Sequence, residues 1–326
     1  MLSFDKFIEI IDRQQESNIL IAAMELNIFT VLNKDGLTAI QVSKKANIKL
    51  DGTVPLLYAL LAMGAISKKK GLFFNTSESY KHFCAHSKDF KKGTIMLRLN
   101  NRREWDSLIK TVREGRNSKE YEGEDEPEFR RLFTYAMHER SESLTGPTSE
   151  FIARSPVGHL LDIGAGPGSY SIAVLKRDKN ARAVLIDRPA ALYVAKKIAN
   201  SMKLTCRLKF LEGDLFDIDY GVGYQTVLFS NILHIYNDKQ NKFLFKKIYN
   251  SLDRGGRLIV GDLFLEENRI RPYETALFSL TMLLYTANGK TYSFMEIKDL
   301  LKAAGFHRFK RHKMDGGNYL IEGIKK

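Results

Sequence analysis

The sequence predicts an α/β protein with a mostly α-helical N-terminal domain and a doubly wound parallel sheet in its C-terminal part. Two observations support this fold class. From residue 157 onward, short aliphatic runs alternate with helical segments, a pattern typical of parallel sheets. Before residue 90, apolar residues recur at helical spacing instead. A chain of 326 residues is long enough for two such domains, each with its own core.

Composition narrows the class of protein. With 44% hydrophobic and 27% charged residues, the chain lies in the ordinary globular range, which excludes a disordered or coiled-coil protein. The two cysteines, Cys84 and Cys206, lie far apart outside any CxxC motif, so we expect neither a disulfide framework nor a bound metal. The N-terminus carries acids among its apolar residues, and the longest apolar run, residues 276–287, is shorter than the roughly 20 residues of a membrane span. We therefore expect a cytoplasmic protein.

The net charge is basic. The 51 Lys and Arg residues exceed the 38 Asp and Glu residues, giving +13, and most of the excess follows residue 151. Nucleic-acid binding is one interpretation, but the basic residues lack the interleaved aromatics of a stacking groove. A solvated basic surface without a ligand is the favoured interpretation. A basic surface that attracts an anionic substrate is an interpretation intermediate between these two.

Residues 1–90 have the order of a helix-turn-helix with a wing. Residues 4–32 predict two amphipathic helices, Thr38 can cap the next, and a further helix is expected over residues 52–63. The charged residues 68–71 indicate the tip of a hairpin between residues 65–66 and 72–74. The candidate recognition helix, residues 53–63, contains no Lys, Arg, Asn or Gln. This favours dimerisation over DNA binding, with the wing lysines as the counter-evidence.

Residues 91–150 are predicted to connect this domain to the sheet. They are polar, with helical segments at residues 105–113 and 129–139 and an acidic patch at residues 120–128 that we expect to loop out. The strands of the C-terminal domain, residues 151–326, are expected at residues 159–164, 181–187, 207–214, 226–231, 257–262 and 318–323.

The strongest chemical signal is a glycine-rich turn after the first of these strands. Residues 160–170 read LLDIGAGPGSY, with Gly164, Gly166 and Gly168 spaced G-x-G-x-G and Asp162 two residues ahead. Glycines there let the backbone approach a ligand at the end of a strand. A dinucleotide fingerprint would have glycine where Ser169 stands, which disfavours a dehydrogenase. A tight turn without a ligand is the alternative interpretation.

Two downstream acids extend this turn into a candidate nucleoside site. Asp187 ends the next strand, where a carboxylate can accept hydrogen bonds from both ribose hydroxyls. Asp214 follows the strand after that and could accept from an adenine amino group. A single acid at a strand end is often only a helix N-cap. Three in register indicate a bound nucleoside.

With these motifs the chain resembles the class I S-adenosylmethionine-dependent methyltransferases, and more narrowly the dimeric small-molecule O-methyltransferases of the caffeic-acid, acetylserotonin and hydroxyneurosporene type. The likeness covers nearly the whole chain. It includes W-x-x-L-x-x-x-V-x-x-G at residues 105–115, FTYAM at 133–137, DIGAGPG at 162–168, GDLF at 213–216 and LHIYND at 233–238. It implies a Rossmann-like C-terminal domain, a winged-helix dimerisation domain over residues 1–90 and a helical connector, residues 91–150, that contributes to the substrate pocket.

The resemblance also implies roles for individual residues. Asp162 and the three glycines would line the methionine portion of the cofactor, and Asp187 would hold the ribose. Asp214, Leu215 and Phe216 would hold the adenine, with the cofactor site completed by Arg188, Gly213, Ser230 and Asn231. Apolar residues at the positions that sandwich a flat substrate are Phe133, Met137, Phe278 and Met282, although helical spacing alone would make them core residues.

His234 matches the general base of the family. An imidazole can take the proton of a phenol or enol at neutral pH as the oxygen attacks the methyl group. Asp262 falls where the family places a carboxylate that orients this histidine. Ile235 stands where the family has Asp, and Thr291 stands where the plant enzymes carry a second carboxylate beside the base. A more acidic acceptor, methylation of carbon, or catalysis mainly by proximity would each fit these departures.

The sequence therefore predicts a homodimeric methyltransferase that uses S-adenosylmethionine to methylate a hydroxyl of a small aromatic or polyketide-like acceptor in secondary metabolism. A first alternative is a C-methyltransferase acting on a ring carbon of a pigment or polyketide. A second, from another class, is a winged-helix DNA-binding regulator with S-adenosylmethionine as its effector. The apolar recognition helix disfavours a nucleic-acid partner, and no membrane partner is expected.

Overall fold

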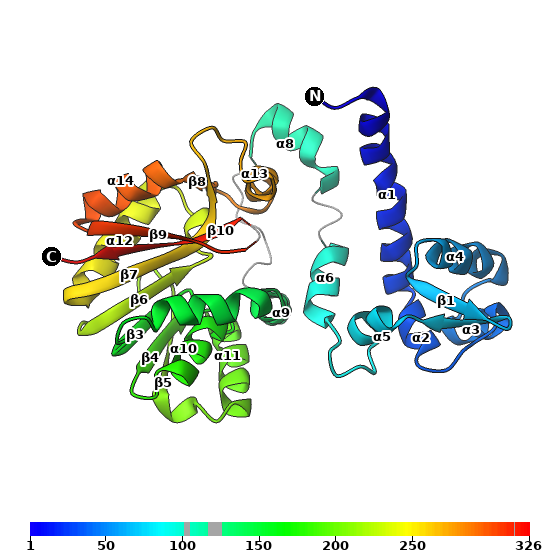
Figure 1. Ribbon diagram of the computed structural model, residues 1–326, viewed down its shortest axis with the longest axis horizontal. Coiled ribbons are helices and arrows are strands. Elements are labelled where there is room, and N and C mark those ends of the chain that lie inside the picture. Colours follow the sequence, from blue (N-terminus) through cyan, green and yellow to red (C-terminus); the bar gives the residue numbers. More distant parts are fainter. Residues whose placement is uncertain (101–104, 117–125, 316) are drawn as a thin grey trace. The chain divides into compact units, whose positions relative to one another are not determined.

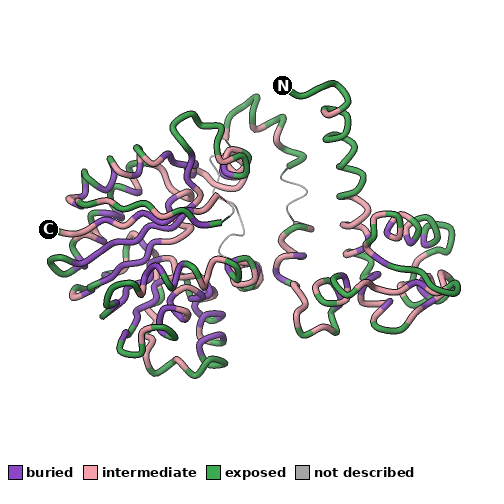
Figure 2. Tube along the Cα trace, viewed as in Figure 1, coloured by how far each residue is buried: buried purple, intermediate pink, exposed green. Residues whose placement is uncertain are grey.

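The computed structural model describes residues 1–100, 105–116, 126–315 and 317–326. The chain divides into two compact units, Met1–Asn100 and Asn101–Lys326. The first unit is helical with one small hairpin, and the second is built on a large sheet (Figure 1). In Figure 2 the buried residues of the second unit follow its strands and the inner faces of its helices. Within the described ranges, no helix combines the length and apolarity needed to cross a bilayer.

The N-terminal unit forms the predicted helices and hairpin. A capping box between Thr38 and Gln41 starts α3, as a Thr N-cap predicts. The hairpin strands β1 and β2 pair around Lys70 and Gly71. The elements are α1 (Phe4–Glu25), α2 (Ile28–Leu32), α3 (Ala39–Ala46), α4 (Leu50–Ala62), β1 (Ile66–Lys69), β2 (Leu72–Asn75), α5 (Ser77–Phe83) and α6 (Lys92–Asn100).

Helix α4 has one buried and one exposed face. Leu57 and Leu60 are fully buried in the core of this unit, whereas Tyr58 is 48% exposed. The wing residue Lys68 folds back onto α4, where its Nζ donates to the Tyr58 hydroxyl and lies 4.5 Å from the ring centroid. This wing lysine is therefore engaged within its own unit.

The sheet of the C-terminal unit has the strand order β5-β4-β3-β6-β7-β10-β9, with the short β8 paired to β7. The first five strands in this order are parallel, and β10 is antiparallel to both β7 and β9. The strands are β3 (His159–Ile163), β4 (Arg182–Asp187), β5 (Leu208–Glu212), β6 (Tyr224–Ser230), β7 (Leu252–Leu265), β8 (Tyr292–Ser293), β9 (His307–Lys313) and β10 (Asn318–Ile324).

The predicted doubly wound sheet is present, but the expectation of parallel strands is wrong for β10 and β9 at one end of the strand order. A short connection joins β9 to β10, and strands joined so closely can only pair in antiparallel fashion. The sequence pattern missed β9 because its residues, HRFKRHK, have no aliphatic run. Its place at the end of the strand order explains this composition, since charged side chains are common on edge strands.

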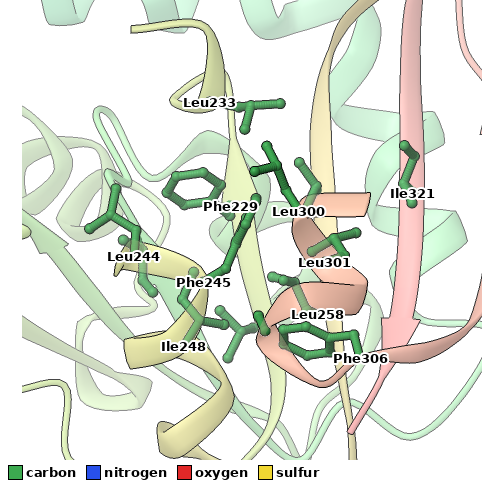
Figure 3. Packing of buried hydrophobic residues seen from close by; sticks show 14 of the residues in the cluster. Phe229, Leu233, Leu244, Phe245, Ile248, Leu258, Leu300, Leu301, Phe306 and Ile321 are labelled. Carbon is green, nitrogen blue, oxygen red and sulfur yellow. The ribbon is translucent and has the colours of Figure 1, made fainter. Parts of the chain in front are cut away.

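Helices cover both faces of the sheet, which makes it doubly wound (Figure 1). Residues of α9, α10 and α11 share one hydrophobic cluster with the strands, and residues of α12 and α14 share another. Figure 3 shows the second cluster, where Phe245 and Leu301 pack from these two helices near Phe229 of the sheet. The helices are α8 (Leu108–Glu114), α9 (Pro127–Ile152), α10 (Ser169–Arg177), α11 (Pro189–Ser201), α12 (Asp238–Ser251), α13 (Tyr273–Tyr285) and α14 (Phe294–Ala304), with 3-10 turns η1 (Thr205–Arg207) and η2 (Leu233–Ile235).

Two predicted helices of the connector differ from the structure. The segment predicted over residues 105–113 is interrupted by a turn at Ser107, after which α8 begins. The segment predicted over residues 129–139 is the first half of α9, which continues through Pro147 to Ile152. Of the acidic patch, residues 120–125 lie outside the described residues, and Glu128 lies in the first turn of α9 rather than in a loop.

Candidate active site

The glycine-rich turn has the backbone geometry that only glycine adopts readily. Gly164, Gly166 and Gly168 have φ angles of +68°, +53° and +68°. A Cβ atom on Gly164 or Gly168 would come within 3 Å of a neighbouring side chain, whereas one on Gly166 would meet nothing within 4 Å. Positions 164 and 168 thus have no room for a side chain, whereas the space beside the Gly166 backbone is open to a ligand.

Asp187 connects the end of β4 to this turn. Its Oδ2 accepts a hydrogen bond from the backbone N–H of Gly166 at 2.7 Å, and its Oδ1 accepts from the N–H of Arg188 at 2.7 Å. Burial raises the pKa of this carboxyl above its ordinary value, and the two N–H donors oppose that rise. The structure therefore brings Asp187 and the glycine-rich turn together, as their strand-end positions predict.

Asp162 lies beneath the turn, in β3. Its side chain is buried and accepts a hydrogen bond from the hydroxyl of Ser171 in α10. Burial raises the pKa of Asp162 to about 7, with a smaller contribution from the negative charge of Asp187. Near neutral pH this carboxyl therefore exchanges between its protonated and ionised forms.

The acid predicted to face the adenine is engaged by a neighbour. Asp214 Oδ2 lies 2.9 Å from Nη2 of Arg188, and Asp214 Oδ1 accepts from the N–H of Phe216 at 2.7 Å. Leu215 is 8% exposed, and the Phe216 ring packs edge-on against Tyr236. Gly213 donates its N–H to the carbonyl of Asp187, which places GDLF beside the end of β4.

A cavity of about 460 Å³ opens beside this group. Its walls come from the N-terminal parts of α9 and α11 and from Glu212 at the end of β5, and the basic residues among them are Arg130, Arg131, Arg188 and Lys196. Sequence reasoning did not identify the two α9 arginines, although they precede the FTYAM motif on the same helix. The cavity gives the Asp187 side of the site a basic wall.

Ser230 is the last residue of β6, and Asn231 follows it. Asn231 has a φ angle of +57°, donates its backbone N–H to Gly261 at 2.7 Å and donates from Nδ2 to Ser230 Oγ at 3.1 Å. The left-handed backbone of Asn231 redirects the chain at the end of the strand. The turn η2 with His234 follows immediately.

His234 and Asp262 form a close pair. The His234 Nδ1 lies 2.7 Å from Asp262 Oδ1, and Asp262 also accepts from the backbone N–H of His234 at 3.3 Å and of Leu263 at 2.7 Å. The carboxylate side chain is 1% exposed and the imidazole side chain 13% exposed. Because a carboxylate is an acceptor, we assign the proton to Nδ1, which leaves Nε2 as an acceptor for another group.

The residues predicted to contact substrate come from two helices. Phe278 of α13 packs edge-on against the His234 ring with 5.0 Å between centroids, and Met282 lies one turn further along α13. Phe133 and Met137 lie one turn apart on α9, and Phe133 also contacts the ring of Phe129. The structure thus places one predicted substrate residue directly against the imidazole.

Both departures from the family pattern have a structural counterpart. Ile235 is half-buried within η2. Thr291 is 4% exposed, and its hydroxyl pairs with that of Ser279 in α13 at 2.5 Å. Thr291 therefore presents a neutral hydroxyl engaged by Ser279, and Asp262 is the acid bonded to the imidazole.

Gly289 packs on the backbone of the histidine turn, a contact that the sequence pattern did not indicate. A Cβ atom there would lie 2.2 Å from the His234 carbonyl oxygen and 3.0 Å from that of Ile235. We expect Gly289→Ala to displace this turn and lower turnover about 10- to 100-fold without weakening cofactor binding, because small misplacements of catalytic groups cost this much. Steady-state kinetics and calorimetry measure the two effects. Gly52→Ala, where a Cβ meets nothing within 4 Å, is the control and should change neither.

A doubly wound sheet that gathers a glycine turn, strand-end acids and a carboxylate-bound histidine at the carboxyl ends of its parallel strands has the architecture of the Rossmann-like proteins, which bind nucleosides at this position. Residues 105–307 match the family described as the O-methyltransferase domain, and the chain belongs to this family. It is an S-adenosylmethionine-dependent O-methyltransferase.

The chain is similar to individual O-methyltransferases over almost its full length. The chain is 24% identical to 3-hydroxy-5-methyl-1-naphthoate 3-O-methyltransferase of Streptomyces sahachiroi, covering 95% of this chain and 92% of the relative. It is 27% identical to chicken (Gallus gallus) acetylserotonin O-methyltransferase, covering 89% and 88%. The fold matches human N-acetylserotonin methyltransferase, solved in complex with S-adenosylmethionine, with a TM-score of 0.83, 23% identity and coverage of 100% and 99%. The predicted fold class, cofactor and main activity are confirmed.

Proposed function

We propose that the enzyme methylates a hydroxyl of a small aromatic or polyketide-like acceptor, with His234 as general base and Asp262 as its orienting partner. The observation that carries this proposal is the 2.7 Å bond from His234 Nδ1 to Asp262, which leaves Nε2 as the acceptor beside Phe278. The naphthoate and acetylserotonin enzymes among the relatives support an aromatic acceptor by their names.

The residues of the glycine turn fit the proposed orientation of the cofactor. The open backbone at Gly166 would face the bound molecule, and the Asp187 carboxylate that already holds this turn would bind the ribose. Asp214 and Arg188 would flank the adenine, and Asp162 would lie under the cationic methionine portion. Leu215, Phe216, Gly213, Ser230 and Asn231 would complete this wall. Bound there, S-adenosylmethionine supplies an electrophilic methyl group on a sulfonium.

The acceptor would lie between α9 and α13 with its hydroxyl at His234 Nε2. Phe278 and Met282 would contact one side of the ring, and Phe133 and Met137 the other. As the hydroxyl oxygen attacks the methyl carbon, its proton passes to Nε2, and the Nδ1–H bond to Asp262 stabilises the positive charge that forms on the imidazole. S-adenosylhomocysteine leaves with the second product, the methyl ether.

A panel of phenols with S-adenosylmethionine labelled with ¹³C in its methyl group tests the substrate class. We expect a labelled methoxy signal in the product of at least one naphthol, indole or cinnamate phenol. Asp187→Ala is the control and should give far less product at the same concentration of S-adenosylmethionine. A labelled methyl on ring carbon would favour the C-methyltransferase alternative. If the enzyme forms no S-adenosylhomocysteine with any phenol of the panel, the proposed class of acceptor is contradicted.

Binding of S-adenosylhomocysteine should depend on pH through Asp162. Its pKa of about 7 in the ligand-free enzyme means that the carboxyl is protonated below this pH and ionised above it. The cationic amino group of the ligand favours the ionised form, so affinity should rise with pH between 6 and 8, by up to about tenfold per unit below pH 7. Calorimetry across this range measures the slope. Asp162→Asn should flatten it, and an equal slope in wild type and variant would contradict the assignment.

We also propose a homodimer formed through the dimerisation domain, residues 1–90. The exposed apolar residues Phe4, Phe7 and Ile11 lie on one face of α1, and they are 76%, 53% and 62% exposed. Replacing both Phe7 and Ile11 by Asp should weaken dimerisation about 100-fold or more, measured by sedimentation equilibrium. Glu16→Lys on the same helix is the control. A wild-type chain that stays monomeric at all concentrations would contradict the proposal.

The remaining expectations concern the surroundings of the enzyme. We infer a cytoplasmic location, supported by the free thiols of Cys84 and Cys206, and fractionation of cells tests it. The DNA-binding alternative has little support, since the exposed face of α4 presents Leu50, Val54 and Tyr58. Salt-dependent binding to duplex DNA would revive it.

A further inference from the structure

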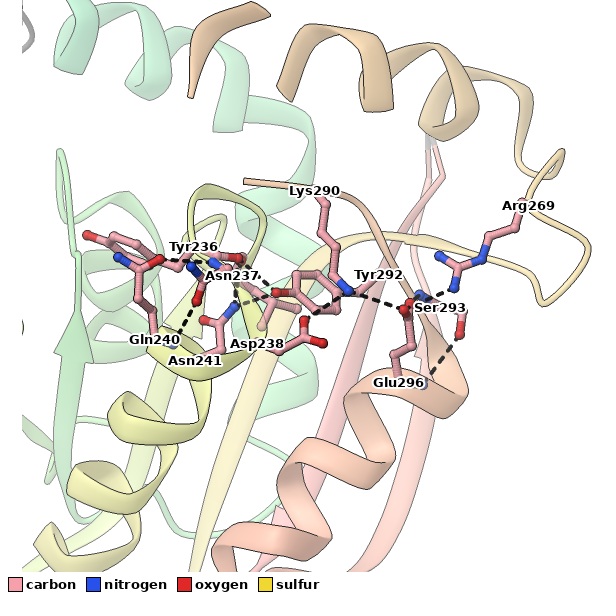
Figure 4. Close-up of polar contacts among 11 residues, drawn as sticks. Tyr236, Asn237, Asp238, Gln240, Asn241, Arg269, Lys290, Tyr292, Ser293 and Glu296 are labelled. Carbon is pink, nitrogen blue, oxygen red and sulfur yellow. Dashed lines mark hydrogen bonds and ion pairs between the residues drawn. The ribbon is translucent and has the colours of Figure 1, made fainter. Parts of the chain in front are cut away.

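Two buried side chains bind the backbone of the turn that carries His234 (Figure 4). Asn241 of α12 is fully buried, and its Nδ2 lies 3.0 Å from the carbonyl oxygens of both Leu233 and Tyr236. The same Nδ2 donates to the hydroxyl of Tyr292 at 2.9 Å, and that hydroxyl donates to the Tyr236 carbonyl at 2.8 Å. We call this arrangement the Asn241–Tyr292 clamp. It holds the carbonyl before His234 and the one two residues after it.

The clamp connects the histidine turn to the strand that carries Asp262. Tyr292 lies in β8, which pairs with β7 in the register Phe264↔Tyr292. Phe264 is two residues beyond Asp262 on the same strand. The position of η2 relative to the carboxylate is therefore fixed both by the His234–Asp262 bond and by the clamp.

Charged pairs cover the outer side of the clamp. Lys290 Nζ lies 2.9 Å from Asp238 and 3.3 Å from Glu296, and it stacks over the Tyr292 ring at 4.6 Å from the centroid. Tyr292 is 1% exposed, and burial raises the pKa of its hydroxyl. The hydroxyl therefore remains a hydrogen-bond donor throughout the physiological pH range.

The last carbonyls of a short 3-10 turn draw donors from outside the turn. The Leu233 carbonyl accepts from the N–H of Tyr236 at 3.3 Å and gains Asn241 as a second donor, whereas the Tyr236 carbonyl accepts from both side chains of the clamp. In this enzyme Asp262 is the acid bonded to the imidazole, and the hydroxyl of Thr291 is engaged by Ser279. A small shift of η2 would lengthen the 2.7 Å bond to Asp262. We propose that Asn241 and Tyr292 are positioning residues that hold the His234 ring in register with Asp262, which rests on the proposed role of His234 as base.

Proton NMR of the enzyme saturated with S-adenosylhomocysteine tests this proposal without an acceptor. The Nδ1–H of a histidine bonded to a carboxylate gives a far-downfield resonance, which His234→Ala assigns by its loss. We expect Tyr292→Phe and Asn241→Leu to shift or abolish this resonance. Tyr224→Phe is the matched control, since Tyr224 is also buried and donates to a backbone carbonyl, that of Tyr220, at the opposite end of β6. It should leave the resonance in place.

Kinetics and stability provide the second readout. With a phenol that the enzyme methylates, Tyr292→Phe should lower kcat about tenfold or more, while affinity for S-adenosylhomocysteine stays within about twofold of wild type. Tyr224→Phe should lower Tm similarly but keep kcat. An unchanged His234 resonance in Tyr292→Phe, or an equal shift in Tyr224→Phe, would overturn the proposal. Should Asn241→Leu not fold, Tyr292→Phe decides alone. The NMR experiment needs no acceptor, so it tests the clamp even if the enzyme methylates no phenol. Failure of the proposed acceptor class is therefore distinguished from failure of the clamp proposal.

Discussion

His234→Ala is expected to lower turnover of a phenol about 10²- to 10⁴-fold, the range for loss of a positioned general base. The imidazole is held by a buried carboxylate at 2.7 Å, so its Nε2 is oriented before the acceptor binds. Steady-state kinetics with the best phenol of the panel measures the loss. Affinity for S-adenosylhomocysteine should stay close to wild type, because in the proposed arrangement His234 faces the acceptor beside Phe278 and not the cofactor.

Asp262→Asn tests the orientation of the His234 imidazole while the imidazole itself is kept. This variant preserves the size of the side chain but replaces a charged acceptor with an amide, which can present its NH₂ group to the imidazole and favour the wrong tautomer. We expect a loss in the same direction as for His234→Ala, and the double variant should lose little more than either single one. An unchanged rate in His234→Ala would remove the histidine mechanism and leave the methyltransferase assignment standing.

Asp187→Ala is expected to weaken binding of S-adenosylmethionine about 10²- to 10⁴-fold. The carboxylate would hold two ribose hydroxyls, and each hydrogen bond to a charged group contributes about 1.5–3 kcal/mol. It also holds the Gly166 N–H at 2.7 Å, so its removal loosens the glycine turn. Isothermal titration calorimetry with S-adenosylmethionine and S-adenosylhomocysteine measures the change.

Asp253→Ala is the matched control for this variant. Asp253 lies at the start of β7, at the end of the parallel sheet opposite the glycine turn, and bonds Gln225. It should leave both affinities unchanged. Binding that survives in Asp187→Ala at wild-type strength would place the ribose elsewhere.

Local chemistry made much of this structure predictable from sequence. The central strands β3, β4 and β6 and the second half of β7 are largely aliphatic, because both faces of a covered parallel sheet are buried there. The positive φ angles of the glycine turn follow from the G-x-G-x-G spacing, since other residues rarely adopt them. His234 and Asp262 follow neighbouring aliphatic runs, and the adjacency of β6 and β7 brings them together.

Contacts between distant segments explain what the sequence did not indicate. Helix α9 continues past Gly146 and Pro147 because Phe151 and Ile152 are buried, while Arg177 of α10 donates to Ser149. The pairing of Arg188 with Asp214 joins two loops. Asn241 and Tyr292 are 51 positions apart, and neither belongs to a motif. Such contacts depend on tertiary packing, which residue patterns along one segment do not report.

The measurement that tests the proposed mechanism most directly compares two acceptors of the same shape whose phenols differ in acidity. Single-turnover rates would be measured for wild type and His234→Ala with a weakly acidic phenol and with a substituted analogue that is largely ionised at the assay pH. If His234 takes the proton, the variant should lose about 10²-fold or more with the first acceptor and far less with the second. An equal loss with both would contradict a role for His234 as the base.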